Sequence, residues 1–184
     1  MRCFIAIDIP QNIRHSIADV IEKCNKKSKG IKWVAPEKIH ITLKFLGEVK
    51  EGLITDIQEK LAPVCAGRDI FTVTIKGAGA FPDFKYPNVL WIGIDESEEL
   101  KRLYEDIEDV LSKLGFEKEN RKFSPHLTIG RIKDRNGIEP VIKEIYTFKD
   151  AFFGSIDVNE ILLMRSVLKS EGAEYSKIAG FRLK

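Results

Sequence analysis

The sequence predicts a protein of mixed helices and strands in which one strand–helix–strand–helix–strand unit occurs twice. Apolar residues alternate in several short segments and recur at three- and four-residue spacing in others, the patterns of strands and helices respectively. Each unit has a histidine at nearly the same distance from its first strand, since Cys3 precedes His40 by 37 positions and Leu90 precedes His126 by 36. Of the 184 residues, 43% are hydrophobic, enough for one compact core. We therefore expect one bilobal domain over residues 1–184, a duplicated unit with pseudo-two-fold symmetry.

The first unit opens with an apolar, β-prone segment at 2–8 that predicts a strand. The segment 11–28 carries apolar residues at helical spacing, and Gly30 is predicted to end this helix. The other elements expected in this unit are strands at 31–34, 39–46 and 69–77 and a helix at 52–65.

The second unit follows a stretch at 77–88 whose glycines and prolines predict a loop. Its helix at 97–114 is apolar along one side and stops at Gly115. After the second unit, a turn near Gly172 is expected to join two further strands. The remaining predictions are strands at 89–94, 125–132, 150–158, 160–168 and 175–183 and a helix at 138–147.

Composition excludes several classes of protein. The net charge of +2 is too small for a polycation, and no apolar run approaches the roughly 18–20 residues of a membrane span. Polar residues follow the first strand at once, so we expect no signal peptide. The cysteines Cys3, Cys24 and Cys65 are odd in number and widely spaced, which argues against a disulfide framework or a zinc site. A reducing cytoplasm is the expected location.

Basic residues gather in two places despite the small net charge, and either place could form a phosphate-binding surface. A solvated lysine-rich face is the favoured interpretation of the first cluster. The second cluster surrounds the third histidine of the chain. The members are Lys23, Lys26, Lys27, Lys29 and Lys32 in the first, and Arg121, Lys122, Arg131, Lys133 and Arg135 in the second.

Two of the three histidines begin an H-x-T tripeptide, His40-Ile41-Thr42 and His126-Leu127-Thr128. Since Thr fills six of 184 positions, such a pairing at two of three histidines is roughly a 0.3% chance event. Residues i and i+2 of a strand point to the same face. Each tripeptide therefore presents an imidazole and a hydroxyl together. The remaining histidine, His15, lacks the pattern and is expected on the surface of the first helix.

This combination suits acid–base chemistry on a phosphodiester. One neutral imidazole can take a proton from a nucleophile, and one protonated imidazole can give a proton to a leaving group. The hydroxyls of Thr42 and Thr128 can donate hydrogen bonds to negatively charged oxygens. If the two strands lie across the pseudo-two-fold axis, all four groups converge on one cleft.

Three other interpretations explain the pattern less well. Two histidines with no carboxylate or cysteine at ligand spacing are too few for a zinc site. Cysteine–histidine catalysis needs an activated thiol, whereas all three cysteines lie at apolar strand or helix positions. Purely structural histidines would not explain the repeated H-x-T pattern.

The segments HITLKFLGEV and SPHLTIGRI resemble those of the 2H phosphoesterases. Within that superfamily, RCFIAIDIP, WVAPEKIHITLKFLGEV and GAFPDFKYPNVLWIGI are similar to the RNA 2′,3′-cyclic phosphodiesterase (2′-5′ RNA ligase) family, in the same order along nearly the whole chain. The resemblance implies a two-lobed α+β fold of mainly antiparallel sheets flanked by helices, with an active-site cleft between the lobes. It also implies that the final strands return to the first lobe.

The resemblance further implies hydrolysis of an RNA terminal 2′,3′-cyclic phosphate to a 2′-phosphate, with no metal or nucleotide cofactor. His40 would protonate the leaving 3′ oxygen and His126 would activate water, an assignment that symmetry makes reversible from the sequence. Thr42 and Thr128 would bind the non-bridging oxygens. The reverse reaction would join RNA ends by a 2′-5′ link without ATP.

Two further residues match the family, although strict strand alternation would turn their side chains away from the motif histidines. Phe45 could stack on the terminal base, and Arg131 could supply charge to a phosphate. Each lies five residues after a motif histidine, so strict alternation turns it to the opposite face from that histidine. A strand end or twist at Gly47, or a bulge at Gly130, would bring them into the cleft. The alternatives are a core position for Phe45 and a surface position for Arg131.

The expected partner is RNA with a 2′,3′-cyclic phosphate end, tRNA fragments being one candidate source, and a monomer is expected with no membrane contact. Two other functions stay open on the sequence. One is a related phosphoesterase acting on a small cyclic nucleotide or an ADP-ribose cyclic phosphate. The other is an RNA-binding module without catalysis, against which the two complete H-x-T motifs argue.

Overall fold

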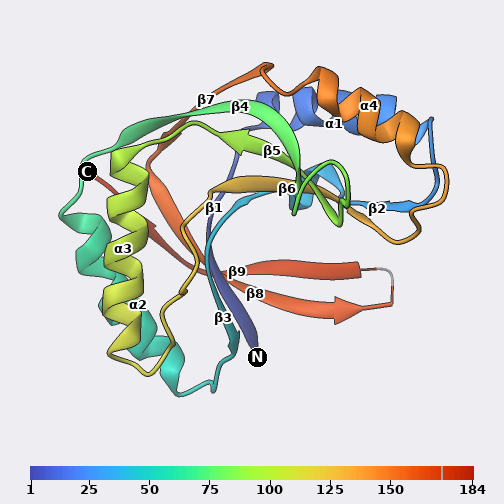
Figure 1. The fold of residues 1–184 in the computed structure, drawn as a ribbon. Helices are drawn as coiled ribbons and strands as arrows, with labels where there is room; N and C mark the ends of the chain where they lie inside the picture. Colours follow the sequence, from blue (N-terminus) through green and yellow to red (C-terminus); the bar gives the residue numbers. More distant parts are fainter. Residues whose placement is uncertain (171) are drawn as a thin grey trace.

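The computed structural model describes residues 1–170 and 172–184 (Figure 1). In these residues nine strands form one sheet in the order β7-β4-β5-β6-β3-β1-β8-β9, with β2 paired to β6. Every strand pair in this order is antiparallel. The predicted α+β fold, with antiparallel sheet flanked by helices, is confirmed. No helix in the described ranges is both long and apolar enough to cross a membrane.

The first unit has all its predicted elements, with some changed ends. Helix α1 ends at Asn25, so Gly30 does not terminate it as predicted. Gly30 instead packs against the chain after β6, where an added Cβ would lie 2.4 Å from the carbonyl oxygen of Asp134. The elements are β1 (Arg2–Ile7), α1 (Gln11–Asn25), β2 (Ile31–Trp33), the short 3-10 helix η1 (Pro36–Lys38), β3 (Ile41–Glu48), α2 (Leu53–Ala66) and β4 (Phe71–Phe81).

Strand β4 runs four residues past its predicted end at Gly77, which shortens the predicted loop to residues 82–88. Small residues allow this extension, since an added Cβ on Gly79 would lie 2.3 Å from the indole ring of Trp91. The second unit follows the prediction closely. In the tail, β9 begins at Gly172, three residues before its predicted start, and the turn predicted near Gly172 includes residue 171, which lies outside the described residues. The second unit and the tail comprise β5 (Val89–Ile94), α3 (Glu98–Ser112), β6 (His126–Ile132), α4 (Glu139–Thr147), β7 (Phe152–Val158), β8 (Glu160–Lys169) and β9 (Gly172–Arg182).

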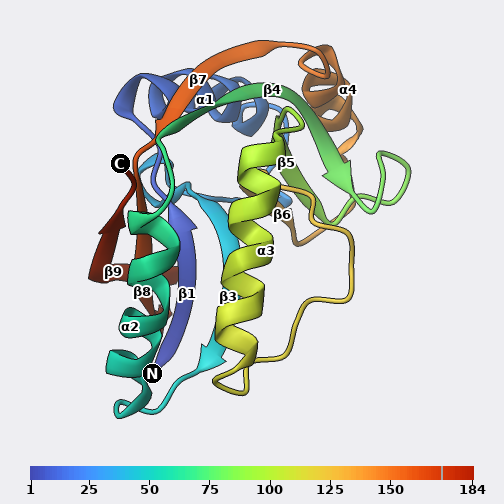
Figure 2. The ribbon, with the colours of Figure 1, turned by 90° about the vertical axis from the view of Figure 1, so that its left-hand side faces the viewer.

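The helices divide the sheet into two lobes (Figures 1 and 2). Lobe A holds β1, β3, β8 and β9, with α2 packed on β8 and β9 and α3 packed on β3. Lobe B holds β2 and β4 to β7, with α1 and α4 packed together against it. Because β8 pairs with β1, the tail returns to the first lobe as the resemblance implied. The exchange goes further than predicted, since α1, β2 and β4 of the first unit belong to lobe B and α3 of the second unit packs on lobe A.

One buried ion pair fixes strand β3 against helix α3. The Lys44 Nζ lies 2.8 Å from both carboxylate oxygens of Glu108 and donates to the carbonyl oxygen of Glu117 at 2.7 Å. Both side chains are about nineteen-twentieths buried, at 5% and 6% exposure. Such a pair holds its partners firmly, because removing either one leaves a buried charge uncompensated.

Candidate active site

The two H-x-T motifs face each other at the point where the lobes meet. Strands β3 and β6 pair through Ile41 and Leu127, whose side chains are fully buried. Continuing that antiparallel register by one residue sets His40 level with Thr128, and Thr42 level with His126. Since Ile41 and Leu127 point into the core, the four flanking side chains share the opposite face. Diagonal neighbours in this arrangement lie roughly 7–8 Å apart. The predicted convergence of two imidazoles and two hydroxyls is therefore present.

The two imidazoles are held in the same orientation. Nδ1 of His40 lies 2.8 Å from the carbonyl oxygen of Lys38, and Nδ1 of His126 lies 2.8 Å from the carbonyl oxygen of Ser124. A carbonyl oxygen only accepts hydrogen bonds, so Nδ1 carries the hydrogen in both rings. The Nε2 atom is then the position at which each neutral ring can accept a proton.

Aromatic rings enclose His40 more fully than His126. The imidazole of His40 stacks on Phe4, with ring centroids 4.9 Å apart and planes 28° apart, and meets the edge of Tyr175 at 5.3 Å. Phe4 is buried beneath these rings and lies outside the main core cluster. His126 has an edge contact with Phe81 at 4.9 Å. The rings restrict the motion of each imidazole and keep water from one side of it.

Burial lowers the pKa of both histidines below the ordinary value of 6.5, because an imidazolium is poorly solvated there. For His40, the bond to Lys38 and the nearby Asp8 carboxylate oppose this decrease in pKa, while Arg14 adds to it. For His126, the bond to Ser124 opposes the decrease, while the Arg131 guanidinium adds to it. Among the described residues, an acidic neighbour that favours the protonated ring lies near His40 and not near His126.

A β-bulge in each strand solves the alternation problem of Phe45 and Arg131. In β3, Thr42 pairs with Ala6 and Lys44 with Ile5, so Leu43 is the extra residue. Phe45 then pairs with Phe4 and lies on the face of His40. The ring centroids of Phe45 and Phe4 are 6.2 Å apart. Phe45 is 72% exposed, so the core alternative is wrong.

The second strand has its bulge at the matching residue. Thr128 pairs with Trp91 and Gly130 with Leu90, so Ile129 is the extra residue. Arg131 thereby returns to the face of His126 and Thr128. Its guanidinium is exposed there, at the edge of the face. The bulge lies one residue before Gly130, the position at which the sequence suggested one.

Sequence reasoning missed the residues that support His40. Arg14 is buried in α1 and donates from Nη1 to the carbonyl oxygens of Pro36 at 2.6 Å and Ile39 at 3.0 Å. It also pairs with Asp8 and so fixes the backbone that enters His40. An arginine on the apolar side of a predicted helix was the available signal. Tyr175, which comes from the tail, gave no signal.

The other candidates have structural roles. His15 is exposed on α1, where it shares a hydrogen bond with Gln11, as predicted. All three cysteines are buried and unpaired, and burial raises the pKa of Cys24 and Cys65 to about 11. Among the described residues, no group of three or more histidine, cysteine or acidic side chains could hold a metal ion.

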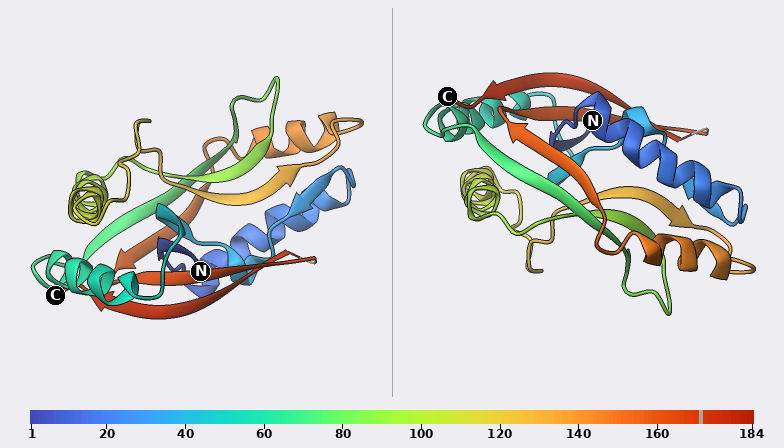
Figure 3. Two further views of the ribbon diagram at one scale, coloured as in Figure 1. Left: turned by 90° about the horizontal axis from the view of Figure 1, so that it is seen from below. Right: turned by 90° about the horizontal axis from the view of Figure 1, so that it is seen from above.

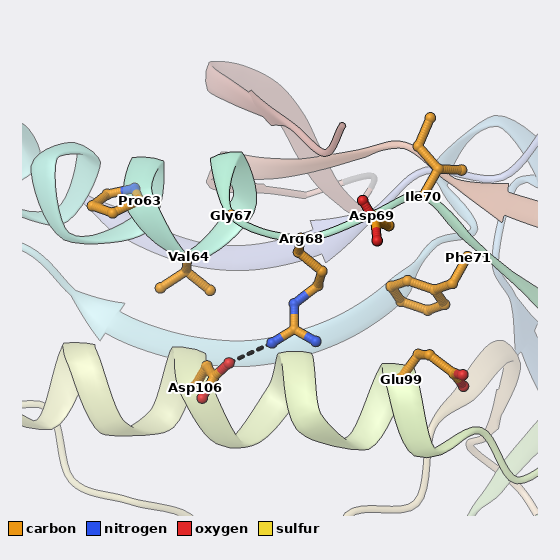
Figure 4. A pocket seen from close by; sticks show the side chains of 9 residues that line it. All are labelled: Pro63, Val64, Gly67, Arg68, Asp69, Ile70, Phe71, Glu99 and Asp106. Atoms are coloured by element: carbon orange, nitrogen blue, oxygen red, sulfur yellow. Dashed lines mark hydrogen bonds and ion pairs between the residues drawn. The ribbon is translucent and has the colours of Figure 1, made fainter.

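A pocket of about 610 Å³ lies away from the histidines, between the end of α2 and α3 (Figure 4). Arg68 crosses it to pair with Asp106, and the acidic Asp69 and Glu99 also line it. None of its lining residues is a predicted site residue. The H-x-T motifs therefore lie outside this pocket.

Residues 10–169 match the 2′-5′ RNA ligase superfamily, and the chain belongs to that family of 2H phosphoesterases. It is 37% identical to the RNA 2′,3′-cyclic phosphodiesterase of Archaeoglobus fulgidus over 98% of this chain and 99% of that protein. Identity to the protein of that name from Methanocaldococcus jannaschii is 39%, over 97% and 98% of the two chains. A crystal structure of a protein from Thermus thermophilus superposes with a TM-score of 0.85, covering 100% and 98% of the chains at 26% identity.

Proposed function

We propose that this protein is an RNA 2′,3′-cyclic phosphodiesterase that opens the terminal cyclic phosphate to a 2′-phosphate. The observation that carries the proposal is the pairing of Ile41 with Leu127, which places both H-x-T motifs on one face. The names of the relatives support the same reaction. We further propose that residues 1–184 act as one bilobal domain and as a monomer, with cleaved tRNA as one source of substrate.

The histidines divide the proton transfers. His126 Nε2 accepts a proton from water as its oxygen attacks phosphorus, and protonated His40 donates a proton to the 3′ oxygen as the P–O3′ bond breaks. Asp8 near His40 favours the protonated ring, and Arg131 near His126 favours the neutral ring. Arg14, which pairs with Asp8, opposes the effect of that carboxylate on His40, so the proposed assignment of His40 as acid and His126 as base follows the family resemblance. With a 5′-hydroxyl in place of water, the same two proton transfers would form a P–O5′ bond as the P–O3′ bond breaks, and so join the RNA ends in a 2′-5′ link without ATP.

The other site residues bind the substrate. The Thr42 and Thr128 hydroxyls donate to the two non-bridging oxygens, whose negative charge grows in the transition state. Arg131 supplies a positive charge beside them. The exposed ring of Phe45 offers a stacking surface for the terminal base. These groups supply acid, base and anion binding, so the proposal requires neither metal nor nucleotide cofactor.

Product analysis tests the reaction. An RNA oligonucleotide ending in a 2′,3′-cyclic phosphate should yield a 2′-phosphate, in EDTA as well as without it. A 3′-phosphate product would refute the assigned leaving group. Comparable or better turnover of a cyclic mononucleotide would favour the small-substrate phosphoesterase instead. RNA binding without turnover would favour a binding module.

A further inference from the structure

Lys32 lies on the same face as the candidate active site. Strand β2 pairs with β6 so that Lys32 is directly opposite Arg131, while Trp33 is opposite Gly130. Residues directly opposite in an antiparallel pair share a face. Because the bulge at Ile129 turns Arg131 toward the site, it also turns its partner Lys32 that way.

The surroundings of Lys32 differ from those of three of its neighbours in the first basic cluster. Lys26 pairs with Glu22 at 2.7 Å, Lys27 pairs with Glu144 at 3.3 Å, and Lys23 lies over the ring of Phe148. These three fit the predicted solvated face. Within residues 1–170 and 172–184, no ion pair is formed by Lys32.

The pairing of Lys32 with Arg131 is unfavourable without a ligand. Both side chains are exposed, and in the described ranges Arg131 also forms no ion pair. Two like charges directly opposite each other destabilise a strand pair. An anion bound near both cations would remove this repulsion.

Lys32 also lies at the mouth of the site. An added Cβ on Gly172, at the start of β9, would be 4.0 Å from Lys32 Nζ. Figures 1 and 3 show the β8–β9 hairpin reaching toward β2, and Tyr175 of that hairpin touches His40. Because the bulge takes up one residue, Arg131 lies two partner-strand residues along from Thr128, a distance of about 7 Å. That distance is comparable with the spacing of successive phosphates in an extended strand.

We propose that Lys32 binds the phosphodiester that joins the terminal nucleotide to its neighbour, opposite Arg131 on the adjoining strand. This inference rests on the proposed function and refines its substrate class. The substrate is then an oligonucleotide end, recognised by a second phosphate as well as by the cyclic one. A cyclic mononucleotide lacks the second phosphate and does not use Lys32.

The test compares kcat/KM for a cyclic mononucleotide and for a dinucleotide ending in a 2′,3′-cyclic phosphate. Lys32→Ala should lower the ratio of dinucleotide to mononucleotide kcat/KM about tenfold, mostly through KM, as loss of one charged hydrogen bond does. Lys32→Arg should preserve the ratio. Lys29→Ala, which removes the same charge three residues away, is the matched control and should leave both values unchanged.

A neutral methylphosphonate in place of the internal linkage sharpens the comparison. For the wild-type protein, the neutral linkage should lower the ratio of dinucleotide to mononucleotide kcat/KM by the same factor as Lys32→Ala does with the natural linkage. In Lys32→Ala, the neutral linkage should lower that ratio no further. An unchanged ratio in Lys32→Ala overturns the inference, as does an equal loss on both substrates or the same loss in Lys29→Ala. In each of those cases the proposed function stands. If the wild-type protein hydrolyses neither substrate, the proposed function fails, and the inference fails with it.

Discussion

Segments 40–45 and 126–131 share a backbone design but have different surroundings. Each begins with a histidine bonded through Nδ1 to the carbonyl two residues earlier, and each has a bulge directly after the threonine. Their neighbours differ, since His40 lies between Phe4 and Tyr175 near Asp8, whereas His126 has Phe81 and a cation nearby. The repeated backbone gives the two histidines the same geometry, and the unrepeated neighbours give them different surroundings.

Replacing either histidine should give the largest effect. His40→Ala and His126→Ala should each lower kcat by about 10²–10⁴-fold, because each removes one proton transfer. A substrate with sulfur in place of the leaving 3′ oxygen separates the two roles, since a thiolate leaves without protonation. With this substrate, the activity of His40→Ala should be restored, whereas His126→Ala should stay inactive. Restoration of His126→Ala instead would reverse the assignment of acid and base.

Replacing either threonine should have a similar effect on kcat, since the two hydroxyls have the same proposed role. Thr42→Val and Thr128→Val keep the shape of the side chain and remove one donor each, so each should lower kcat roughly a hundredfold with little change in the thermal midpoint. Steady-state kinetics and thermal unfolding check both statements. A loss confined to one variant would show that only one oxygen of the phosphate is held by a threonine.

Tyr175 tests whether the enclosure of His40 matters. Tyr175→Ala removes an edge contact and should lower kcat about two- to tenfold, in line with the energy of an aromatic pair. Tyr175→Phe keeps the ring and should retain kcat. If the phenylalanine variant were as poor as the alanine variant, the hydroxyl rather than the ring would be the active part.

The pH profile should show the smallest effects. Burial lowers the pKa of both histidines, so the bell-shaped profile of kcat/KM should have its maximum on the acidic side of neutral. Arg131→Gln removes a cation near the base, which raises the pKa of His126 and moves the acidic limb to higher pH. Asp8→Asn removes an anion near the acid, which lowers the pKa of His40 and moves the alkaline limb to lower pH. Movement of the opposite limb in either variant would contradict the assigned roles.

The sequence predicted the parts of the site that depend on local periodicity. His40 and Thr42 share a face because they are two residues apart in one strand, and the matching motif at His126 indicated a second such strand. A bulge near Gly130 could be suggested from the sequence, but the bulge at Leu43 and the exact place of the one at Ile129 could not, because an extra residue is defined by the register of the neighbouring strand. Phe45 was ambiguous for the same reason.

Long-range pairing explains what else was missed. Tyr175 of β9 reaches His40 because β9 pairs with β8 and β8 pairs with β1, an arrangement that leaves no periodic signal in the tail. The end of α1 was also predicted wrongly, because Gly30 is required by its approach to Asp134 rather than by a helix end. Packing between segments far apart in the sequence determines both the position of Tyr175 and the need for glycine at position 30.

The ion pair of Lys44 with Glu108 also protects β3 against misalignment. A slip of one residue past β1 would return Phe45 to the interior and draw the Lys44 ammonium out of it, leaving the Glu108 carboxylate buried without its cation. That error would cost about 3–5 kcal/mol. An apolar residue at position 44 would tolerate the slipped alignment far better. The buried charge of Lys44 on one side of β3 thus favours the alignment that keeps Phe45 exposed on the other side.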